Sequence, residues 1–217
     1  MAVTANERPS GLRERKKVAL RTALIEAAYE LFEAKGVDGT PVEEICAVVD
    51  VSPRTFHRYF PSKDDLFFVG APERLARVER VLRERPESEP LLATLEAAAA
   101  AAVVLVDVPR DARREGRRLR IIEANDRLRA RNLRVSEELA DAIAVEVARR
   151  LDLRPSAALP QLLGAWTIAA VRTTYRRWIS NPRLDLVAEL HAALVTLADV
   201  TAATGPLWSK TAPGKQP

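Results

Sequence analysis

The 217-residue sequence has one cysteine, two histidines and few aromatic residues, which make up 5% of the chain. Its single cysteine, Cys46, cannot form a disulfide within the chain, which fits a reducing cytoplasm. One cysteine and two widely separated histidines also provide no credible zinc site. The sequence shows neither a glycine-rich phosphate-binding loop nor a nucleophile beside a suitable base. It therefore predicts neither a cofactor nor an enzyme.

Long hydrophobic runs are also lacking. The apolar run AAAAAAVVLV lies between Glu96 and Asp107 and is too short to span a bilayer. The first eleven residues, MAVTANERPSG, lack the apolar core of a signal peptide. We therefore expect a cytoplasmic protein.

Helix-forming residues dominate the remainder of the sequence. Alanine, leucine, arginine and glutamate are abundant, and β-branched and aromatic runs are scarce, which favours helix almost everywhere. Hydrophobic residues make up 47% and charged residues 29%, as in ordinary globular proteins. Together these features predict an all-α protein. Apolar periodicity, caps and breakers place its helices at about 12–35, 41–49, 53–59, 63–85, 91–106, 111–152, 159–180 and 184–200. Pro72 lacks an N–H, so we expect the stretch 63–85 to be interrupted at 70–72, where the helix is kinked or broken. The stretch 111–152 is expected to form one or two helices, and Ser136, followed by Glu138, is the candidate cap for a second start.

Three helix starts follow one another closely between residues 40 and 63. Thr40 before Pro41, and Ser52 before Pro53, each predict an N-cap followed by a proline at the first helical position. Ser62 predicts a third cap, with an acidic residue three positions later. The two helices between these starts must be short and joined by a tight turn. This arrangement predicts a helix-turn-helix.

The stretch VSPRTFHRYFPSK (residues 51–63) divides its side chains between two faces of the second short helix. Phe56 and Phe60 share one face, which we expect to anchor the helix on its neighbours. Arg54, His57 and Arg58 share the opposite face. Arginine matches the O6 and N7 acceptors of guanine, so this face suits the major groove of DNA. The alternative interpretation is a solvated face without a ligand.

Residues 13–66 resemble the DNA-binding domain of the TetR family of bacterial transcriptional regulators. The resemblance rests on AAYELFEAKG (27–36), GTPVEEIC (39–46) and VSPRTFHRYFPSKDDL (51–66). It implies base contacts from one group of side chains and DNA-backbone contacts from another. The first group is Arg54, Thr55, His57 and Arg58, and the second is Thr40, Ser52, Tyr59 and Lys63.

The chain departs from the family pattern at two places. Family members often have Ala-Gly in the turn, where this chain has Val49 and Asp50, and Asp adopts the left-handed conformation less readily than Gly. His57 stands where an aromatic residue is common, so its contact with DNA could differ or respond to pH. Both departures bear on how the second helix is presented to DNA.

The resemblance also implies the organisation of the rest of the chain. We expect a flexible N-terminal arm (1–11), the helix-turn-helix domain (12–66), a helical effector-binding and dimerisation domain (67–202) and a flexible tail (203–217). Trp166, Tyr175 and Trp178 could line a pocket for a lipophilic effector, but core or dimer packing explains them equally well. Apolar stripes that include Leu159, Leu162, Trp166 and Ala170, then Val187, Leu190 and Leu194, predict a homodimeric four-helix bundle. A two-fold dimer would suit a palindromic operator in double-stranded DNA.

Charge is distributed unevenly along the chain, whose formal net charge is +4. Residues 1–66 carry ten Lys and Arg against eleven Asp and Glu, and residues 109–154 carry thirteen against nine. The Arg110–Arg120 stretch could bind an anion, but a solvated face paired with Glu115 and Glu123 is the simpler interpretation.

The function predicted from the sequence is transcriptional regulation, most simply repression relieved by a small molecule. Two alternatives stay open. One is an architectural DNA-binding protein that has no effector and binds DNA with little sequence preference. The other is a helical binding or scaffold protein whose helix-turn-helix no longer binds DNA.

Overall fold

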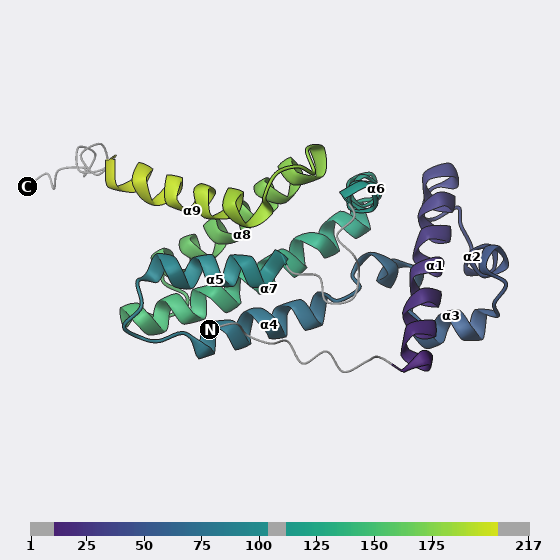
Figure 1. Cartoon of the computed structure of the whole chain (residues 1–217), viewed down its shortest axis with the longest axis horizontal. Helices are drawn as coiled ribbons and strands as arrows, with labels where there is room; N and C mark the ends of the chain where they lie inside the picture. Colours follow the sequence, from purple (N-terminus) through teal and green to yellow (C-terminus); the bar gives the residue numbers. More distant parts are fainter. Residues whose placement is uncertain (1–10, 104–111, 204–217) are drawn as a thin grey trace, which may run out of the picture. The chain divides into compact units, whose positions relative to one another are not determined.

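A computed structural model describes residues 11–103 and 112–203 of the chain (Figure 1). These residues form α-helices and one short 3-10 helix, η1, and contain no strand, so the all-α prediction is confirmed. The elements are α1 (Leu12–Lys35), α2 (Val42–Val49), α3 (Pro53–Tyr59), η1 (Lys63–Phe67), α4 (Ala71–Glu84), α5 (Leu91–Val103), α6 (Ala112–Glu123), α7 (Asp126–Leu151), α8 (Ala158–Ser180) and α9 (Leu186–Ala203). None of these helices is both long enough and apolar enough to cross a bilayer. Residues 204–217 of the predicted tail, residues 1–10 of the predicted arm and Arg110 lie outside the described residues.

The described residues divide into two compact units. The N-terminal unit contains the chain up to Val69 together with Arg117–Arg129 from the second half of the sequence. The C-terminal unit contains the remaining helical segments from Gly70 onward. The helix α6 is continuous across the boundary, because its residues up to Gly116 belong to one unit and those from Arg117 to the other.

The core of the N-terminal unit forms around α1. Leu24, Ala28 and Phe32 are buried along one stripe of α1, as its periodicity predicts. Phe67 of η1 stacks on both Tyr29 and Phe32, with ring centroids 5.4 Å apart in each pair. The helix then ends at Gly36, whose φ of 76° is readily adopted only by glycine. These contacts give α2 and α3 a fixed base beside α1.

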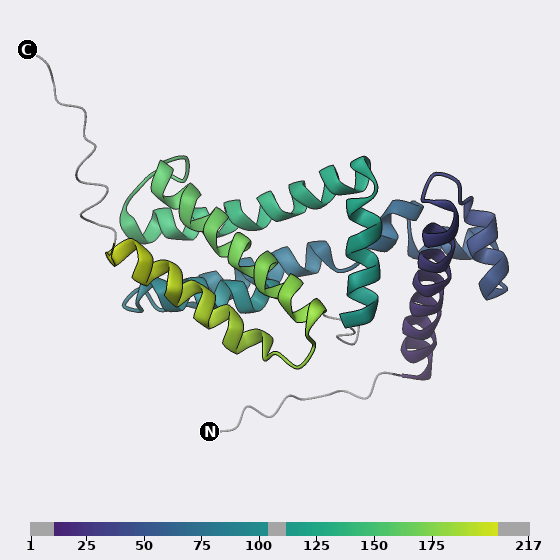
Figure 2. The same ribbon diagram turned by 90° about the horizontal axis from the view of Figure 1, so that it is seen from above.

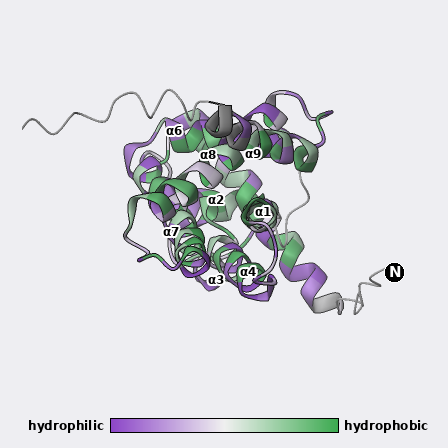
Figure 3. Cartoon of the chain, turned by 90° about the vertical axis from the view of Figure 1, so that its left-hand side faces the viewer, coloured by the Kyte–Doolittle hydropathy of each residue, from purple (hydrophilic) through white to green (hydrophobic). Residues whose placement is uncertain are grey.

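The C-terminal unit packs its helices around two groups of buried side chains. One group joins α4, α5, α7 and α8 through Val78, Ala98, Ile143 and Ile168. The other joins α5, α8 and α9 and includes Leu190. The helices α8 and α9 lie side by side (Figure 2). Hydrophobic and hydrophilic residues alternate along the helices, as the green and purple segments of Figure 3 show.

Close approach of α7 and α8 requires a glycine. A Cβ atom built on Gly164 of α8 would lie 2.3 Å from the carbonyl oxygen of Ala140 on α7. Real atoms do not approach so closely, so the two backbones can be this near only because residue 164 has no side chain.

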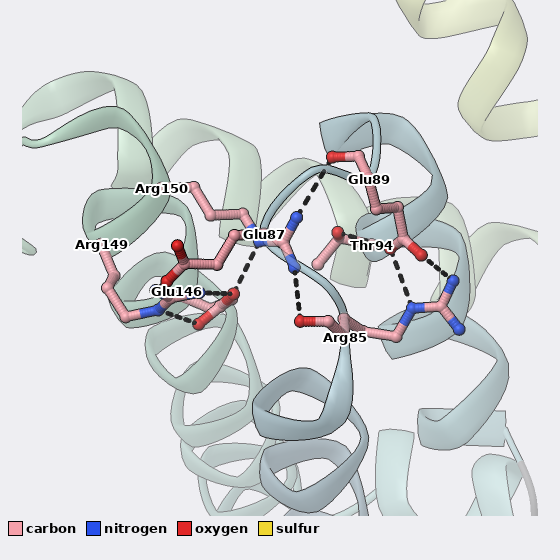
Figure 4. Close-up of polar contacts among 7 residues, drawn as sticks. All are labelled: Arg85, Glu87, Glu89, Thr94, Glu146, Arg149 and Arg150. Atoms are coloured by element: carbon pink, nitrogen blue, oxygen red, sulfur yellow. Dashed lines mark hydrogen bonds and ion pairs between the residues drawn. The ribbon is translucent and has the colours of Figure 1, made fainter.

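A polar network ties the loop between α4 and α5 to the end of α7 (Figure 4). The guanidinium of Arg150 donates to the Glu146 carboxylate and to the backbone carbonyls of Glu89 and Arg85. Glu89 in turn accepts hydrogen bonds from the side chains of Arg85 and Thr94. Arg149 pairs with both Glu146 and Glu87. Every side chain of this network therefore has a partner of opposite charge or polarity.

The interruption predicted at residues 70–72 is confirmed. The 3-10 helix η1 ends at Phe67 and α4 starts at Ala71, so Pro72 lies in the first turn of α4, where its missing N–H is harmless.

Two local predictions are wrong. Thr40 does not cap α2, which begins one residue later with Pro41 at the N-cap position and no side-chain cap. Ser136 does not start a helix. It lies within α7, and its hydroxyl donates to the Asn132 carbonyl.

The break between α6 and α7 comes at Asn125 instead. Its side-chain oxygen accepts a hydrogen bond from the backbone N–H of Leu128, which is the interaction of an N-cap. The stretch predicted as one or two helices is therefore two, and the second starts ten residues before Ser136.

Candidate nucleic-acid interface

The turn between α2 and α3 is closed by a residue in the left-handed conformation. Asp50 has φ 55° and ψ 50°, and its N–H points back to the last turn of α2. The N–H of Val51 donates to the carbonyl of Cys46 at 3.0 Å, which satisfies a carbonyl at the helix end. Asp50 thus adopts the geometry that glycine commonly provides, and the departure at this position keeps a tight turn.

The start of α3 is capped as predicted. The Ser52 hydroxyl oxygen accepts a hydrogen bond from the N–H of Thr55 at 3.2 Å, and Pro53 occupies the first helical position. The two hydroxyls of Ser52 and Thr55 also lie within hydrogen-bond distance, 3.0 Å apart. These two hydroxyls, which belong to residues predicted to contact DNA, therefore lie together at the N-terminal end of α3.

The two faces of α3 differ as the sequence pattern predicts. Phe56 and Phe60 are buried and pack on each other with centroids 5.4 Å apart. Arg54, His57 and Arg58 are exposed. The helix is thus held by its aromatic face and presents its basic face to solvent.

Aromatic rings also order the basic face. The guanidinium carbon of Arg58 lies 5.2 Å from the centre of the Tyr59 ring, within the range of a cation–π contact. His57 meets Phe56 edge to face at 5.4 Å. These contacts restrict the positions of Arg58 and His57, whereas nothing described in the structure restricts the Arg54 guanidinium in this way.

The basic side chains of α3 differ in their partners from other basic side chains of the N-terminal unit. Lys35 pairs with Glu44 at 2.6 Å, and four arginines of residues 117–129 pair with carboxylates. Among the described residues, no carboxylate pairs with Arg54, His57 or Arg58. An unpaired basic face on an anchored helix is what an anionic partner requires.

Two residues predicted to contact DNA are engaged inside the protein. Thr40 is fully buried, and its hydroxyl donates to the carbonyl of Gly36 at 2.8 Å. The Lys63 ammonium donates to the carbonyls of Val37 and Thr40 at 2.6 and 2.9 Å. Both side chains therefore fix the loop between α1 and α2. The Thr40 hydroxyl is not on the surface, and only one N–H of the Lys63 ammonium remains for another acceptor.

Cys46 belongs to the packed side of α2. Its thiol is buried, and burial, helped by the nearby Glu43 carboxylate, raises its pKa. The thiol is thus held in its neutral form and fills space as a small apolar group.

The three aromatic residues predicted to line an effector pocket do not all lie together. Tyr175 and Trp178 stack at 5.6 Å and belong to the buried group between α5, α8 and α9. Trp166 lies on the outward side of α8 with Leu159 and Leu162, all exposed in the single chain. The structure thus separates Trp166 from the other two.

Sequence patterns did not reveal a set of arginines from residues 117–129 that contact the N-terminal unit. Arg117 and Arg120 reach Glu33 on α1, and Arg127 reaches Asp38 and Asp64. These partners are 63–89 residues away in the chain. The only sequence signal was complementary charge, since residues 1–66 have a small acidic excess and residues 109–154 a basic one.

Comparisons with known proteins agree with this geometry. The family described as bacterial regulatory proteins, tetR family, matches residues 24–69, and the one described as MftR C-terminal domain matches residues 89–202. The chain is 34% identical over 187 residues to the HTH-type transcriptional regulator TcmR of Streptomyces glaucescens, a match that covers 82% of this chain and 81% of that one.

Two solved structures have the same fold. A complex of SmeT with triclosan has a TM-score of 0.56 at 17% identity, covering 85% of this chain and 91% of that one. FadR of Bacillus subtilis in complex with stearoyl-CoA has a TM-score of 0.51 at 19% identity, covering 81% of this chain and 96% of that one.

Proposed function

The chain belongs to the TetR family of bacterial regulatory proteins, which are DNA-binding transcription factors and not enzymes, and we propose that it is a repressor released by a small molecule. It binds a palindromic operator as a homodimer in the cytoplasm, where the bacterial chromosome lies. The observation that carries the proposal is the exposed face of α3. Its two guanidinium groups, Arg54 and Arg58, have no carboxylate partner among the described residues, while Phe56 and Phe60 anchor the opposite face.

Within this proposal, Arg54 reads a base. Its side chain is exposed at the N-terminal end of α3, and a free guanidinium fork can meet O6 and N7 of one guanine. Thr55, His57 and Arg58 lie on or beside the same face and complete the reading surface. Ser52 and Tyr59, at the two ends of α3, are proposed to contact the DNA backbone. The buried hydroxyl of Thr40 is left out of this surface, and Lys63 can contribute one N–H.

The test is an affinity titration with the DNA upstream of the chain's own gene and a scrambled duplex, at about 0.15 M salt. Arg54→Ala should lose about 1–3 kcal/mol on the specific duplex and far less on the scrambled one. Arg134→Ala is the matched control, since Arg134 is exposed on α7 and has the same charge. Equal binding of both duplexes, unchanged by Arg54→Ala, would favour the architectural alternative.

The small molecule is proposed to be lipophilic. The supporting observation is the stacked pair Tyr175 and Trp178, which borders the buried group between α5, α8 and α9. The solved relatives SmeT and FadR hold triclosan and stearoyl-CoA, both lipophilic. A ligand can release DNA only if it binds the released state more tightly. Calorimetry with a panel of lipophilic acids should find a binder that lowers operator affinity, and a panel without any binder would contradict the proposal.

The homodimer is proposed to form through α8 and α9. Leu159, Leu162, Trp166 and Val187 are large hydrophobic side chains that stay exposed in the single chain. Ala170, Leu190 and Leu194, which the sequence pattern assigned to the same interface, are buried within the protomer instead. Large apolar side chains that stay exposed on adjacent helices are typical of a surface that a second copy covers.

A further inference from the structure

We propose that Arg117 is a positioning residue for DNA binding, because it is the centre of an electrostatic clamp that holds α6 to the rest of the N-terminal unit. The clamp consists of Arg117, Arg120 and Arg127 and their partners Glu26, Glu33, Asp38 and Asp64. Its effect on DNA rests on the proposed function, whereas its effect on the dynamics of the chain does not.

The clamp is built from ion pairs between distant parts of the sequence. Arg117 is forked between two carboxylates of α1, at 3.2 Å from Glu26 and 3.0 Å from Glu33. Arg120 adds a second, longer contact to Glu33 at 3.4 Å. Glu26 and Glu33 are seven residues apart on α1, which is about two turns. The two terminal nitrogens of the Arg117 guanidinium each meet one of these carboxylates, which the single nitrogen of a lysine could not do.

A second group of contacts lies at the start of α7. Arg127 reaches Asp38 of the loop after α1 at 3.1 Å and Asp64 of η1 at 2.8 Å. The guanidinium of Arg118 also donates to the backbone carbonyl of Phe67. Residues 117–127 therefore contact α1, the following loop and η1 together, which is why this stretch belongs to the N-terminal unit.

Burial decides which arginine matters most. The side chain of Arg117 is 17% exposed, whereas that of Arg120 is 67% exposed. Exposed ion pairs contribute little, because water solvates the separated charges nearly as well. A largely buried guanidinium with two carboxylates has no such replacement, so its loss leaves acids that remain partly desolvated. Arg117 is therefore the residue to test.

The continuity of α6 gives the clamp a consequence. Ala112, at the start of α6, is buried in the C-terminal unit with the group that includes Trp178. Arg117 lies less than two turns further along the same uninterrupted helix. A shift of the first turns of α6 is therefore passed to α1 through the ion pairs. Without these ion pairs, α6 could move without moving α1, or α2 and α3, which pack onto α1 in that order.

This coupling would matter only when two N-terminal units of a dimer bind one operator. Once one N-terminal unit has bound its half-site, binding of the other unit to the second half-site is intramolecular. The strength of this second binding step depends on how narrowly the position of the second unit is restricted. Loosening the clamp should therefore weaken binding to a complete palindrome and leave binding to a single half-site unchanged. A residue that touches DNA, or that merely keeps the unit folded, would affect both duplexes.

The test compares Arg117→Met, Arg117→Lys and the control Arg134→Met, which removes the same charge from an exposed site on α7. Affinities are measured for a full palindromic operator obtained by selection and for a duplex with one half-site. Arg117→Met should lose about fivefold or more on the full operator and less than about twofold on the half-site. Arg117→Lys should recover part of the loss, since it keeps the charge but cannot reach both acids. Equal losses on both duplexes, or no loss on either, would overturn the proposal.

Hydrogen exchange without DNA separates failure of the clamp from failure of the proposed function. Amides of α6 and of residues 26–35 should exchange at least about threefold faster in Arg117→Met than in Arg134→Met, because local opening becomes easier. Unchanged exchange overturns the clamp even if the operator is bound normally. A wild-type chain that binds neither duplex refutes the proposed function, and the exchange rates then decide about the clamp alone.

Discussion

Replacing Arg150 by methionine tests whether burial or the number of contacts determines the contribution of an ion pair in the C-terminal unit. Methionine keeps most of the unbranched stem and removes the guanidinium. The Arg150 side chain is 6% exposed, and its Nε lies 2.6 Å from the Glu146 carboxylate. Its two other contacts go to the carbonyls of Glu89 and Arg85 at 3.3 and 3.4 Å.

The expected loss follows from these three contacts. A charge-assisted hydrogen bond contributes about 1.5–3 kcal/mol, and the two long bonds to carbonyls add about 1 kcal/mol together. The loss stays near the lower end of the range for breaking a buried pair, about 3–5 kcal/mol, because Arg149 still accompanies Glu146. Arg150→Met should therefore cost about 3 kcal/mol. In a chain of this size, that lowers Tm by about 6–12 °C.

Arg149→Met is the matched control. Arg149 makes two hydrogen bonds to the same Glu146 carboxylate and a further pair with Glu87, but its side chain is 47% exposed. Water can therefore solvate the carboxylates that Arg149 leaves unpaired. Arg149→Met should lower Tm by less than half as much as Arg150→Met does. Thermal unfolding followed by circular dichroism at one fixed protein concentration measures both variants, since dimerisation makes Tm depend on concentration.

The effect of Arg150→Met should also depend on pH. Burial alone would raise the pKa of Glu146, but the hydrogen bonds from Arg149 and Arg150 outweigh it and lower the pKa below its ordinary value of 4.5. The stabilisation is therefore complete at neutral pH and is lost as the pH falls through this lowered folded-state value. The Tm difference between wild type and variant should narrow below about pH 4. An equal decrease in Tm for Arg149→Met and Arg150→Met would refute the reasoning. A Tm difference between wild type and Arg150→Met that stays constant in acid would refute it as well.

Two further substitutions test helix packing and assembly. Gly164→Ala should lower Tm, because the added methyl group meets the Ala140 carbonyl and overpacking costs about 1–3 kcal/mol or more. This cost exceeds the gain of about 1 kcal/mol that alanine brings to a helix. A higher Tm would contradict the close approach of α7 and α8. Leu162→Glu should convert the dimer into a folded monomer in sedimentation equilibrium. Leu162 is 60% exposed in the single chain, so the substitution leaves the protomer intact, but the proposed interface would bury the new carboxylate at a high cost. A dimer of unchanged affinity would mean that the interface lies elsewhere.

Helix positions were predictable where a local signal marks each end. The bounds of α1 and α3 match the prediction because Gly36 ends one helix and Ser52 with Pro53 starts the other. The cap at Ser62 is also confirmed, since its N–H and hydroxyl both donate to the Asp65 carboxylate. Each of these signals acts within four residues, so the sequence contains all the information that the structure uses.

Cap residues misled where the hydroxyl bonds to a carbonyl four residues earlier in the chain. Thr40 has the side chain of an N-cap, but its hydroxyl turns back to the carbonyl of Gly36, and the Lys63 ammonium closes the same loop. Ser136 bonds its own helix instead of starting another. A hydroxyl can serve either the next helix or the previous turn, and only packing chooses between them.

Long-range contacts of the candidate site could not be predicted from the sequence. Periodicity assigned Arg117 and Arg120 to a helix face with acidic neighbours, but the partners that the structure provides, Glu26 and Glu33, are 84–91 residues away. The division of α3 into a buried aromatic face and an exposed basic face was predictable, because seven residues are enough to show both faces of a helix of two turns. Pairing across the chain depends on which helices meet, and this information is not local.

The division of the N-terminal unit between two stretches of sequence has a practical consequence for protein engineering. A DNA-binding domain that ends at Val69 is an obvious cassette for fusion to another regulator's sensor, but the unit found here also includes Arg117–Arg129. A chimaera joined at residue 69 would leave Glu26, Glu33, Asp38 and Asp64 facing whatever residues the new sensor supplied at this place. A functional fusion therefore needs arginines at the helix positions of Arg117, Arg120 and Arg127 in addition to the DNA-binding domain.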